Sequence, residues 1–276
     1  MPVLMSSIAS KATKLTTKAK SLASRSSLYL WTFRYLHPMQ IAYMFIRRVI
    51  NISPRLCEDI DSQTKTGFRL FEHIHPDKNL LQGNTLTFLN TAIELDLNNI
   101  DWSCTKHPKL WRYNLHYFDY LLDPQSHIDS DCQLIDSWIE NNPPGTEDAW
   151  EPYTMSLRIV NWIKYFATVY PNELPQHWLY SIYQQAYYLE QQIEYHILAN
   201  HYLKNGVALL FAGTFFVGDD ANRWRKKGMK IILEEANEQL LEDGGHYERS
   251  PMYHSIVTED YLDVFNLLES NESFNS

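Results

Sequence analysis

The chain has 276 residues, enough for one large domain or two small ones, and its 45% hydrophobic and 21% charged residues are the balance of a folded globular protein. Its 8 Trp, 18 Tyr and 12 Phe exclude a disordered chain, and a low content of 9 Gly disfavours turn-dense all-β folds and Gly-rich phosphate loops. The net charge of −9 is unevenly distributed, because residues 1–57 carry nine Lys and Arg and no Asp or Glu, which leaves −18 on the remainder.

The basic segment 1–57 comes first, and we expect it to be partly disordered or to form a peripheral helix. Residues 1–27 lack the apolar stretch of a secretory signal peptide. Only twelve residues separate Arg34 from Arg47 in the apolar run that follows, whereas a membrane-spanning helix needs ~20. The segment could contact an anionic membrane surface, dock on the next domain or direct the chain to an organelle. These features favour a cytoplasmic or membrane-peripheral location.

Residues 58–105 are predicted to form short strands and a linker. The apolar runs 86–89 and 93–97 are bounded by turn-forming Gly and Asn residues, which is typical of two or three short strands. From residue 106 the pattern is helical, and short connections between seven helices predict antiparallel neighbours. The helices are expected at 110–122, 131–140, 153–170, 176–198, 200–217, 222–241 and 253–268.

Two of these predicted helices are apolar almost all round, as helices buried between other helices must be. The polar residues of helix 153–170 reduce to one stripe that includes Arg158 and Asn161. In helix 200–217 the polar residues gather in the first turns. A polar stripe and a polar end on buried helices predict a pocket at this place.

The densest group of titratable side chains lies at 243–254, behind a Gly-Gly pair that ends a helix. Such a loop can bring a phenol, imidazoles and a guanidinium together, as proton transfer at an acidic sugar requires. The alternative is a loop whose polar residues have no functional role. The group comprises His246, Tyr247, Glu248, Arg249, Tyr253 and His254.

Four motifs together resemble the heparinase II/III family of polysaccharide lyases, and they occur in that family's order over most of residues 68–269. The resemblance implies an incomplete (α/α) toroid followed by a large antiparallel β-sandwich, and cleavage of uronic-acid polysaccharides by β-elimination. The expected fold class is therefore mainly α, with an incomplete (α/α) toroid at 106–276 and a few short strands before it. The motifs are Leu110–Asp119, Trp150–Tyr153 followed by Ser156–Lys164, Leu198–Gly206 and Asp243–His254.

The resemblance implies catalytic roles for Asn200 or His201 and for Tyr253. β-Elimination removes the C5 proton of a uronate, so an amide or a cation must stabilise charge that develops on the adjacent carboxylate. A phenol, with an ordinary pKa near ~10, needs a nearby cation to act as a base, whereas a histidine near ~6.5 is suited to neutral pH. The alternatives are that Asn200 caps its helix and that Tyr253 only begins the last one. The substrate-binding candidates are Arg158, Asn161, His246, Glu248, Arg249 and His254.

No cofactor is expected in this chain. His196 and His201 do not share one face of a helix, and no P-loop or dinucleotide motif occurs. The resemblance places a further histidine, and in some members a zinc site, in the family's β-sandwich domain. Because the sequence ends at Ser276, directly after the last predicted helix, we expect a toroid that lacks this domain and has a missing or separate β-sandwich as its partner, and the activity of the chain alone stays open.

The expected ligand is an acidic polysaccharide, either heparin- or heparan-like or a bacterial capsular or lipopolysaccharide glycan, and nucleic acid is not expected. Because the body of the chain is acidic, such a polymer must be bound locally, by Arg158, Arg249, the basic start of helix 222–241 or residues 1–57. Two alternatives stay open. One is a non-catalytic protein that binds acidic polysaccharide, and the other is a toroid glycoside hydrolase that uses carboxylates such as Glu248 and Glu259.

Overall fold

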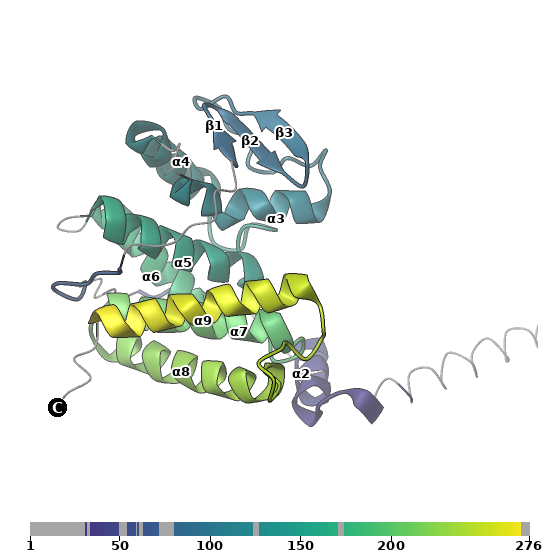
Figure 1. Cartoon of the computed structure of the whole chain (residues 1–276). Helices are drawn as coiled ribbons and strands as arrows, with labels where there is room; N and C mark the ends of the chain where they lie inside the picture. The colour runs from purple at the N-terminus through teal and green to yellow at the C-terminus, as the bar shows by residue number, and fades with distance from the viewer. Residues whose placement is uncertain are drawn as a thin grey trace, which may run out of the picture. The chain divides into compact units, whose positions relative to one another are not determined.

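The chain forms two compact units, Met1–Asn51 and Ile52–Ser276. In the first, helix α2 (Pro38–Val49) ends with Arg47 and Arg48, where cations complement the helix dipole. Within the described residues no helix is long and apolar enough to cross a membrane. Membrane contact by residues 1–57 stays a prediction, and its first thirty residues lie outside the described part. The computed structural model (Figure 1) describes Trp31 and residues 34–49, 54–58, 60, 63–71, 80–123, 127–170 and 174–271.

The second unit is mainly helical, which confirms the predicted fold class. An antiparallel sheet of order β1-β2-β3 lies beside α3, and α8 and α9 lie at the opposite side of the unit with α5 to α7 between (Figure 1). The strands are β1 (Leu81–Gln82), β2 (Thr85–Phe88) and β3 (Thr91–Glu94). The helices are α3 (Lys109–Tyr117), the 3-10 helix η1 (Asp119–Leu122), α4 (Ile128–Asn141), α5 (Pro152–Val169), α6 (Gln176–Glu190), α7 (Ala199–Phe215), α8 (Asp219–Gln239) and α9 (Pro251–Asn271).

Two predicted helices differ from the structure. The predicted helix 110–122 is interrupted at Phe118, whose φ of 62° reverses the backbone between α3 and η1 and places its ring against Trp102 and Trp162. The predicted helix 176–198 ends at Glu190, so residues 191–198 form a loop that leads into α7. This loop supplies one of the side chains of the site described below.

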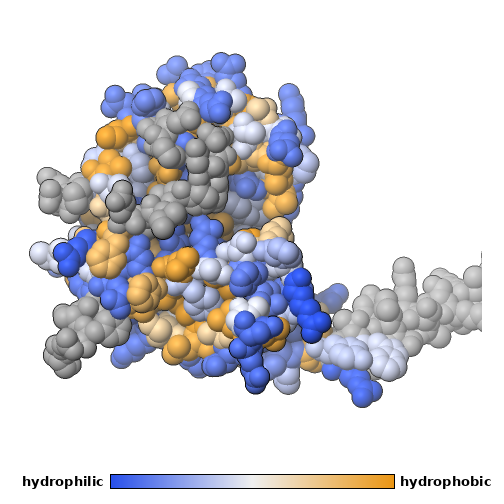
Figure 2. Space-filling view, in the orientation of Figure 1, coloured by the Kyte–Doolittle hydropathy of each residue, from blue (hydrophilic) through white to orange (hydrophobic). Residues whose placement is uncertain are grey.

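α5 and α7 are the buried helices, as their apolar composition predicts. Outside them, α9 buries only one stripe, which includes Val257, Val264 and Leu267. Figure 2 shows apolar side chains over the region that α9 occupies in Figure 1, and the large apolar residues that α9 exposes are Met252, Leu262 and Phe265. The helix is therefore covered on one side only by the described residues.

α7 and α8 are in direct backbone contact because glycines line their interface. A Cβ atom on Gly228 would lie 2.6 Å from the carbonyl oxygen of Gly206, and one on Gly213 would lie 2.6 Å from the carbonyl oxygen of Ala221. These neighbours are backbone atoms of the facing helix, so they cannot move aside as a flexible side chain can. The interface therefore requires glycine.

Replacing Gly213 with alanine is expected to lower the free energy of unfolding by about 1–3 kcal/mol, because overpacking outweighs the better helix propensity of alanine. Urea denaturation followed by circular dichroism measures the change. Gly245→Ala is the control, since Gly245 lies in a loop outside this interface and its Cβ would meet only the side chain of Asp243. A Gly213→Ala protein as stable as the parent would contradict the close approach of the two helices.

Candidate functional site

The first turns of α5, α7 and α9 lie at one end of the helical layer. Tyr153 in the first turn of α5 contacts His201 in the first turn of α7, with 4.3 Å between the ring centroids. Lys204 of α7 reaches α9 through an ion pair with Asp260, at 2.5 Å between Nζ and Oδ1. Because the N-terminus of a helix carries partial positive charge, three such ends favour a negatively charged ligand here.

His201 is held by a buried carboxylate. Its Nδ1 lies 3.0 Å from Oε1 of Glu194, whose side chain is 7% exposed, while the side chain of His201 is 38% exposed. The other oxygen of Glu194 accepts a hydrogen bond from Nδ2 of Asn205 at 3.1 Å. Nε2 of His201 makes no hydrogen bond to any residue that the structure describes, so it remains available to a ligand.

Charged groups surround Tyr153. Burial raises the pKa of Tyr153, Lys204 opposes the rise, and the charges of Asp260 and Glu194 add to it. Burial alone would lower the pKa of Lys204, but Asp260 and Tyr153 outweigh this effect and raise the pKa, so Lys204 is a cation. Tyr153 therefore lies within electrostatic reach of Lys204, Asp260 and Glu194.

Asn200 has an uncommitted amide. The residue is 8% exposed, yet its Oδ1 has no hydrogen-bond partner, and α7 has no side-chain cap at its start, so the predicted alternative of a helix cap is wrong. A buried polar group without a partner costs about 1–3 kcal/mol. The two preceding residues, Leu198 and Ala199, have φ of 61° and 50°, a conformation that side chains with a Cβ rarely adopt. Such strain concentrates at functional sites.

Tyr253 lies half-buried in the first turn of α9, and the structure places no hydrogen bond between it and Asn200 or His201. Its ring lies near that of His246, with 6.0 Å between the centroids. Glu248, Arg249 and His254 are exposed around the start of α9 and are free to meet a large ligand.

Three of the predicted substrate-binding residues face the protein itself. Arg158 is 0% exposed and donates hydrogen bonds to Gln185 Oε1 and to the carbonyl oxygens of His116 and Ala149. Asn161 donates to the carbonyl oxygen of Tyr117, and buried His246 contacts Oε1 of Gln239 at 2.9 Å. In this structure these side chains support the fold, and their binding of substrate stays a prediction.

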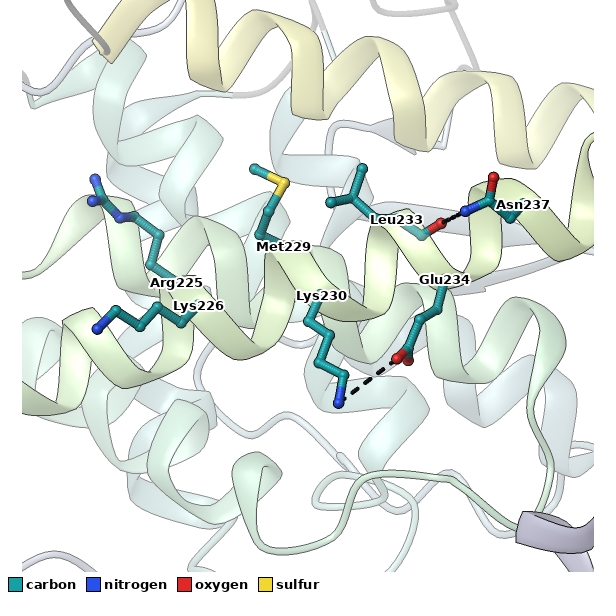
Figure 3. Close-up of a pocket in the computed structure, with 7 residues that line it drawn as sticks. All are labelled: Arg225, Lys226, Met229, Lys230, Leu233, Glu234 and Asn237. Atoms are coloured by element: carbon teal, nitrogen blue, oxygen red, sulfur yellow. Dashed lines mark hydrogen bonds and ion pairs between the residues drawn. The ribbon is translucent and has the colours of Figure 1, made fainter. Parts of the chain in front are cut away.

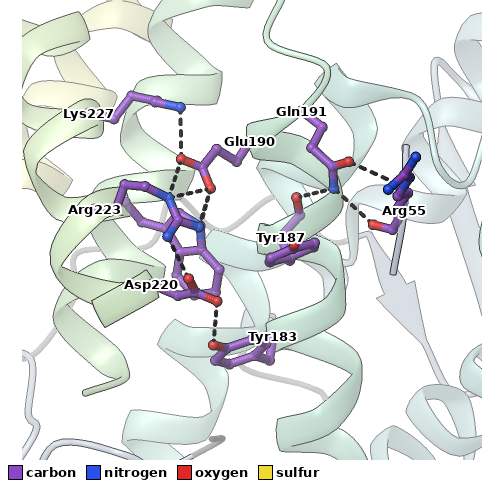
Figure 4. Close-up of polar contacts among 9 residues, drawn as sticks. Arg55, Tyr183, Tyr187, Glu190, Gln191, Asp220, Arg223 and Lys227 are labelled. Atoms are coloured by element: carbon purple, nitrogen blue, oxygen red, sulfur yellow. Dashed lines mark hydrogen bonds and ion pairs between the residues drawn. The ribbon is translucent and has the colours of Figure 1, made fainter. Parts of the chain in front are cut away.

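The basic start of α8 is divided between two surfaces. Arg225, Lys226 and Lys230 lie along one side of the helix, next to a hollow of about 610 Å³ (Figure 3). Arg223 and Lys227 instead bind Glu190 at the end of α6, with Nη2 and Nζ at 2.8 and 2.7 Å from its oxygens (Figure 4). Burial alone would raise the pKa of Glu190, but these two cations hold it below its ordinary value. This pair therefore joins α6 to α8.

Three site residues were not among the predicted ones. Tyr153 and Lys204 lie within motifs that carry the family resemblance, next to residues that drew more attention. Glu194 was assigned to the predicted helix 176–198 and not to the loop before α7. It lies seven residues before His201, a distance in sequence that a loop can close. Within the described ranges no three His, Cys, Asp or Glu side chains gather to hold a metal ion.

The antiparallel helices and the polar groups at their N-terminal ends define a protein of the (α/α)-toroid class. Residues 87–276, more than half of the chain, match the family described as heparinase II/III N-terminus. The chain therefore belongs to the heparinase II/III family and contains its N-terminal portion.

Relatives and a solved structure agree with this assignment. The chain is 30% identical over 159 residues to a heparin-sulfate lyase of Bacteroides thetaiotaomicron, covering 54% of this chain and 22% of that protein. It is 29% identical over 139 residues to a heparin-sulfate lyase of Pedobacter heparinus, covering 46% and 21%. A solved heparinase III shares the fold with a TM-score of 0.50 and 21% identity, over 62% of this chain and 32% of that one. The chain thus spans about a fifth of the length of these curated relatives.

Proposed function

We propose that this chain is the toroid portion of a lyase that cleaves uronic-acid-containing polysaccharides by β-elimination, with catalytic roles for Asn200, His201 and Tyr253. The observation that carries the proposal is the buried amide of Asn200 next to His201: its Oδ1 has no partner, its Nδ2 makes no hydrogen bond to any described residue, and Nε2 of His201 is available. The relatives named heparin-sulfate lyases favour a heparan-type polymer as the substrate.

Each group has one role in the proposed reaction. The amide of Asn200 donates a hydrogen bond to the uronate carboxylate, which spreads the negative charge that develops when C5 loses its proton. Nε2 of His201 takes this proton, and the electron pair of the broken C–H bond forms the C4–C5 double bond. The bond between C4 and the glycosidic oxygen breaks, and the hydroxyl of Tyr253 protonates the leaving oxygen.

Other features of this end suit a long acidic sugar chain. Tyr113, Tyr117 and Tyr153 follow one another from α3 to α5, with ring centroids 6.4 and 6.0 Å apart. Exposed Arg249 and His254 lie beside the start of α9 and are the proposed contacts for carboxylate or sulfate groups. A β-sandwich domain, of the same chain or another, is the proposed partner that forms the opposite wall.

The full chain is to be incubated with heparan sulfate, hyaluronan and alginate, and the ultraviolet absorbance of unsaturated uronate recorded. We expect cleavage of heparan sulfate, and Tyr253→Phe is expected to lower the rate by about 100-fold or more while polymer binding, measured by calorimetry, persists. Tyr180→Phe, on the exposed side of α6, is the matched control.

Absence of product with every polymer, or an unchanged rate in Tyr253→Phe, would sink the catalytic proposal. Binding without cleavage would instead favour a non-catalytic polysaccharide-binding protein. Products with saturated sugar ends would indicate a hydrolase.

A further inference from the structure

The carboxylate of Glu194 is buried without a Lys or Arg partner. Its oxygens contact Nδ1 of His201 and Nδ2 of Asn205, and its backbone N–H donates to Oδ1 of Asn205 at 2.8 Å. Asn205 is itself fully buried, and its Nδ2 also donates to Oγ of Ser156 at 3.0 Å. The side chain of Glu194 is therefore held in one position by groups from α5 and α7.

A buried carboxylate is retained only where it is paired and hydrogen-bonded. The titratable and charged groups around His201 are Glu194 from the preceding loop, Tyr153 from α5, Lys204 from α7 and, beyond Tyr153, Tyr253 and Asp260 from α9. Lys204 is already bound by Asp260. Among these groups, only the imidazole of His201 can supply a positive charge in contact with Glu194.

We propose that Glu194 is the positioning residue for His201, which it holds with the proton on Nδ1 so that Nε2 faces the substrate as a base. This inference rests on the proposed elimination. When Nε2 receives the C5 proton, the ring becomes an imidazolium whose charge is next to the carboxylate. Glu194 stays ionised throughout, as the carboxylate of a catalytic triad does. Hydrogen bonds from Asn205 to Glu194 and Ser156 connect this contact to α7 and α5.

The test compares Glu194→Gln with the parent chain by two measurements. In the ligand-free protein, ring ¹⁵N chemical shifts of His201 report which nitrogen carries the proton. We expect the Nδ1–H form in the parent and a mixture of both forms in Glu194→Gln, because an amide can donate as well as accept. In the lyase assay, kcat is expected to fall by about 100-fold with KM within about twofold.

Glu190→Gln is the matched control, because it removes another buried carboxylate that contacts Arg223 and Lys227 rather than His201. If Glu194→Gln does not fold, Glu194→Asp is tested instead. This variant keeps the negative charge but moves the carboxylate away from His201, so an intermediate change in the nitrogen shifts is expected. Unchanged shifts in a folded Glu194 variant would overturn the inference. If the parent chain shows no lyase activity, the proposed function fails. The nitrogen shifts then still test whether Glu194 holds the proton of His201 on Nδ1.

Discussion

Replacing Arg158 with alanine is expected to lower the free energy of unfolding by about 3–5 kcal/mol, the range expected when a large buried side chain is truncated and buried acceptors lose their donors. Its guanidinium contacts Gln185, the carbonyl oxygens of His116 and Ala149 at 3.1 and 2.8 Å, and the face of Trp138 at 3.9 Å. Removal leaves two buried carbonyl oxygens without donors and opens a cavity in the core. Urea denaturation of the parent and variant measures the loss.

Two further variants separate the charge of Arg158 from its geometry. Arg158→Lys keeps a cation but cannot reach three acceptors that lie in different directions, so an intermediate loss is expected. Lys226→Ala, on the exposed side of α8, is expected to change stability by less than about 0.5 kcal/mol. A loss below about 1 kcal/mol in Arg158→Ala would show that the surrounding carbonyl oxygens find other donors.

Glu235 makes stability depend on pH with the opposite sign to most carboxylates. It is 1% exposed, and burial raises its pKa to about 7, with the charges of Glu238 and Glu234 adding and a hydrogen bond from Gln239 opposing. In the unfolded chain it titrates near its ordinary value of 4.5. Between these values the native state holds a proton that the unfolded state has lost, so stability falls as pH rises.

Glu235→Gln is therefore expected to raise the free energy of unfolding by at most about 3 kcal/mol at about pH 8 and to leave it almost unchanged at about pH 4. The neutral amide can still accept the hydrogen bond of Gln239, which lies at 2.6 Å in the parent. Denaturant titrations at both pH values make the measurement, with Glu242→Gln, at an exposed residue that does not contribute to the pKa shift of Glu235, as the control. Equal effects of Glu235→Gln at the two pH values would contradict a protonated carboxyl in the native state.

Hydrophobic periodicity predicted the long helices well, because burial of one face or of all faces leaves a clear pattern in α5, α7 and α8. Proline marked two helix starts, at Pro152 and Pro251. The break at Phe118 had no such signal, since a left-handed residue without glycine is held by its tertiary contacts. The end of α6 was missed for a similar reason, because residues 176–198 contain neither Gly nor Pro.

The sequence allowed us to predict which residues belong to the candidate site but not which other groups they contact. Motifs led to Asn200, His201 and Tyr253, and the structure adds the uncommitted amide and the strained backbone before it. Arg158 and His246 were expected to bind substrate because sequence indicates chemistry without showing burial. Their partners are mostly distant backbone carbonyls and amides, which no spacing rule reveals.

The glycine contact between α7 and α8 has a consequence for how a polymer enters the site. At Gly213 and Gly228 the two backbones meet directly, so no change of side-chain rotamer at these positions can alter the distance between the helices. We expect this contact to restrain α7, whose first turn carries Asn200 and His201, before a ligand binds. Any adjustment to the width of a sugar chain falls to the 240–250 loop and to α9, which is covered on one side only.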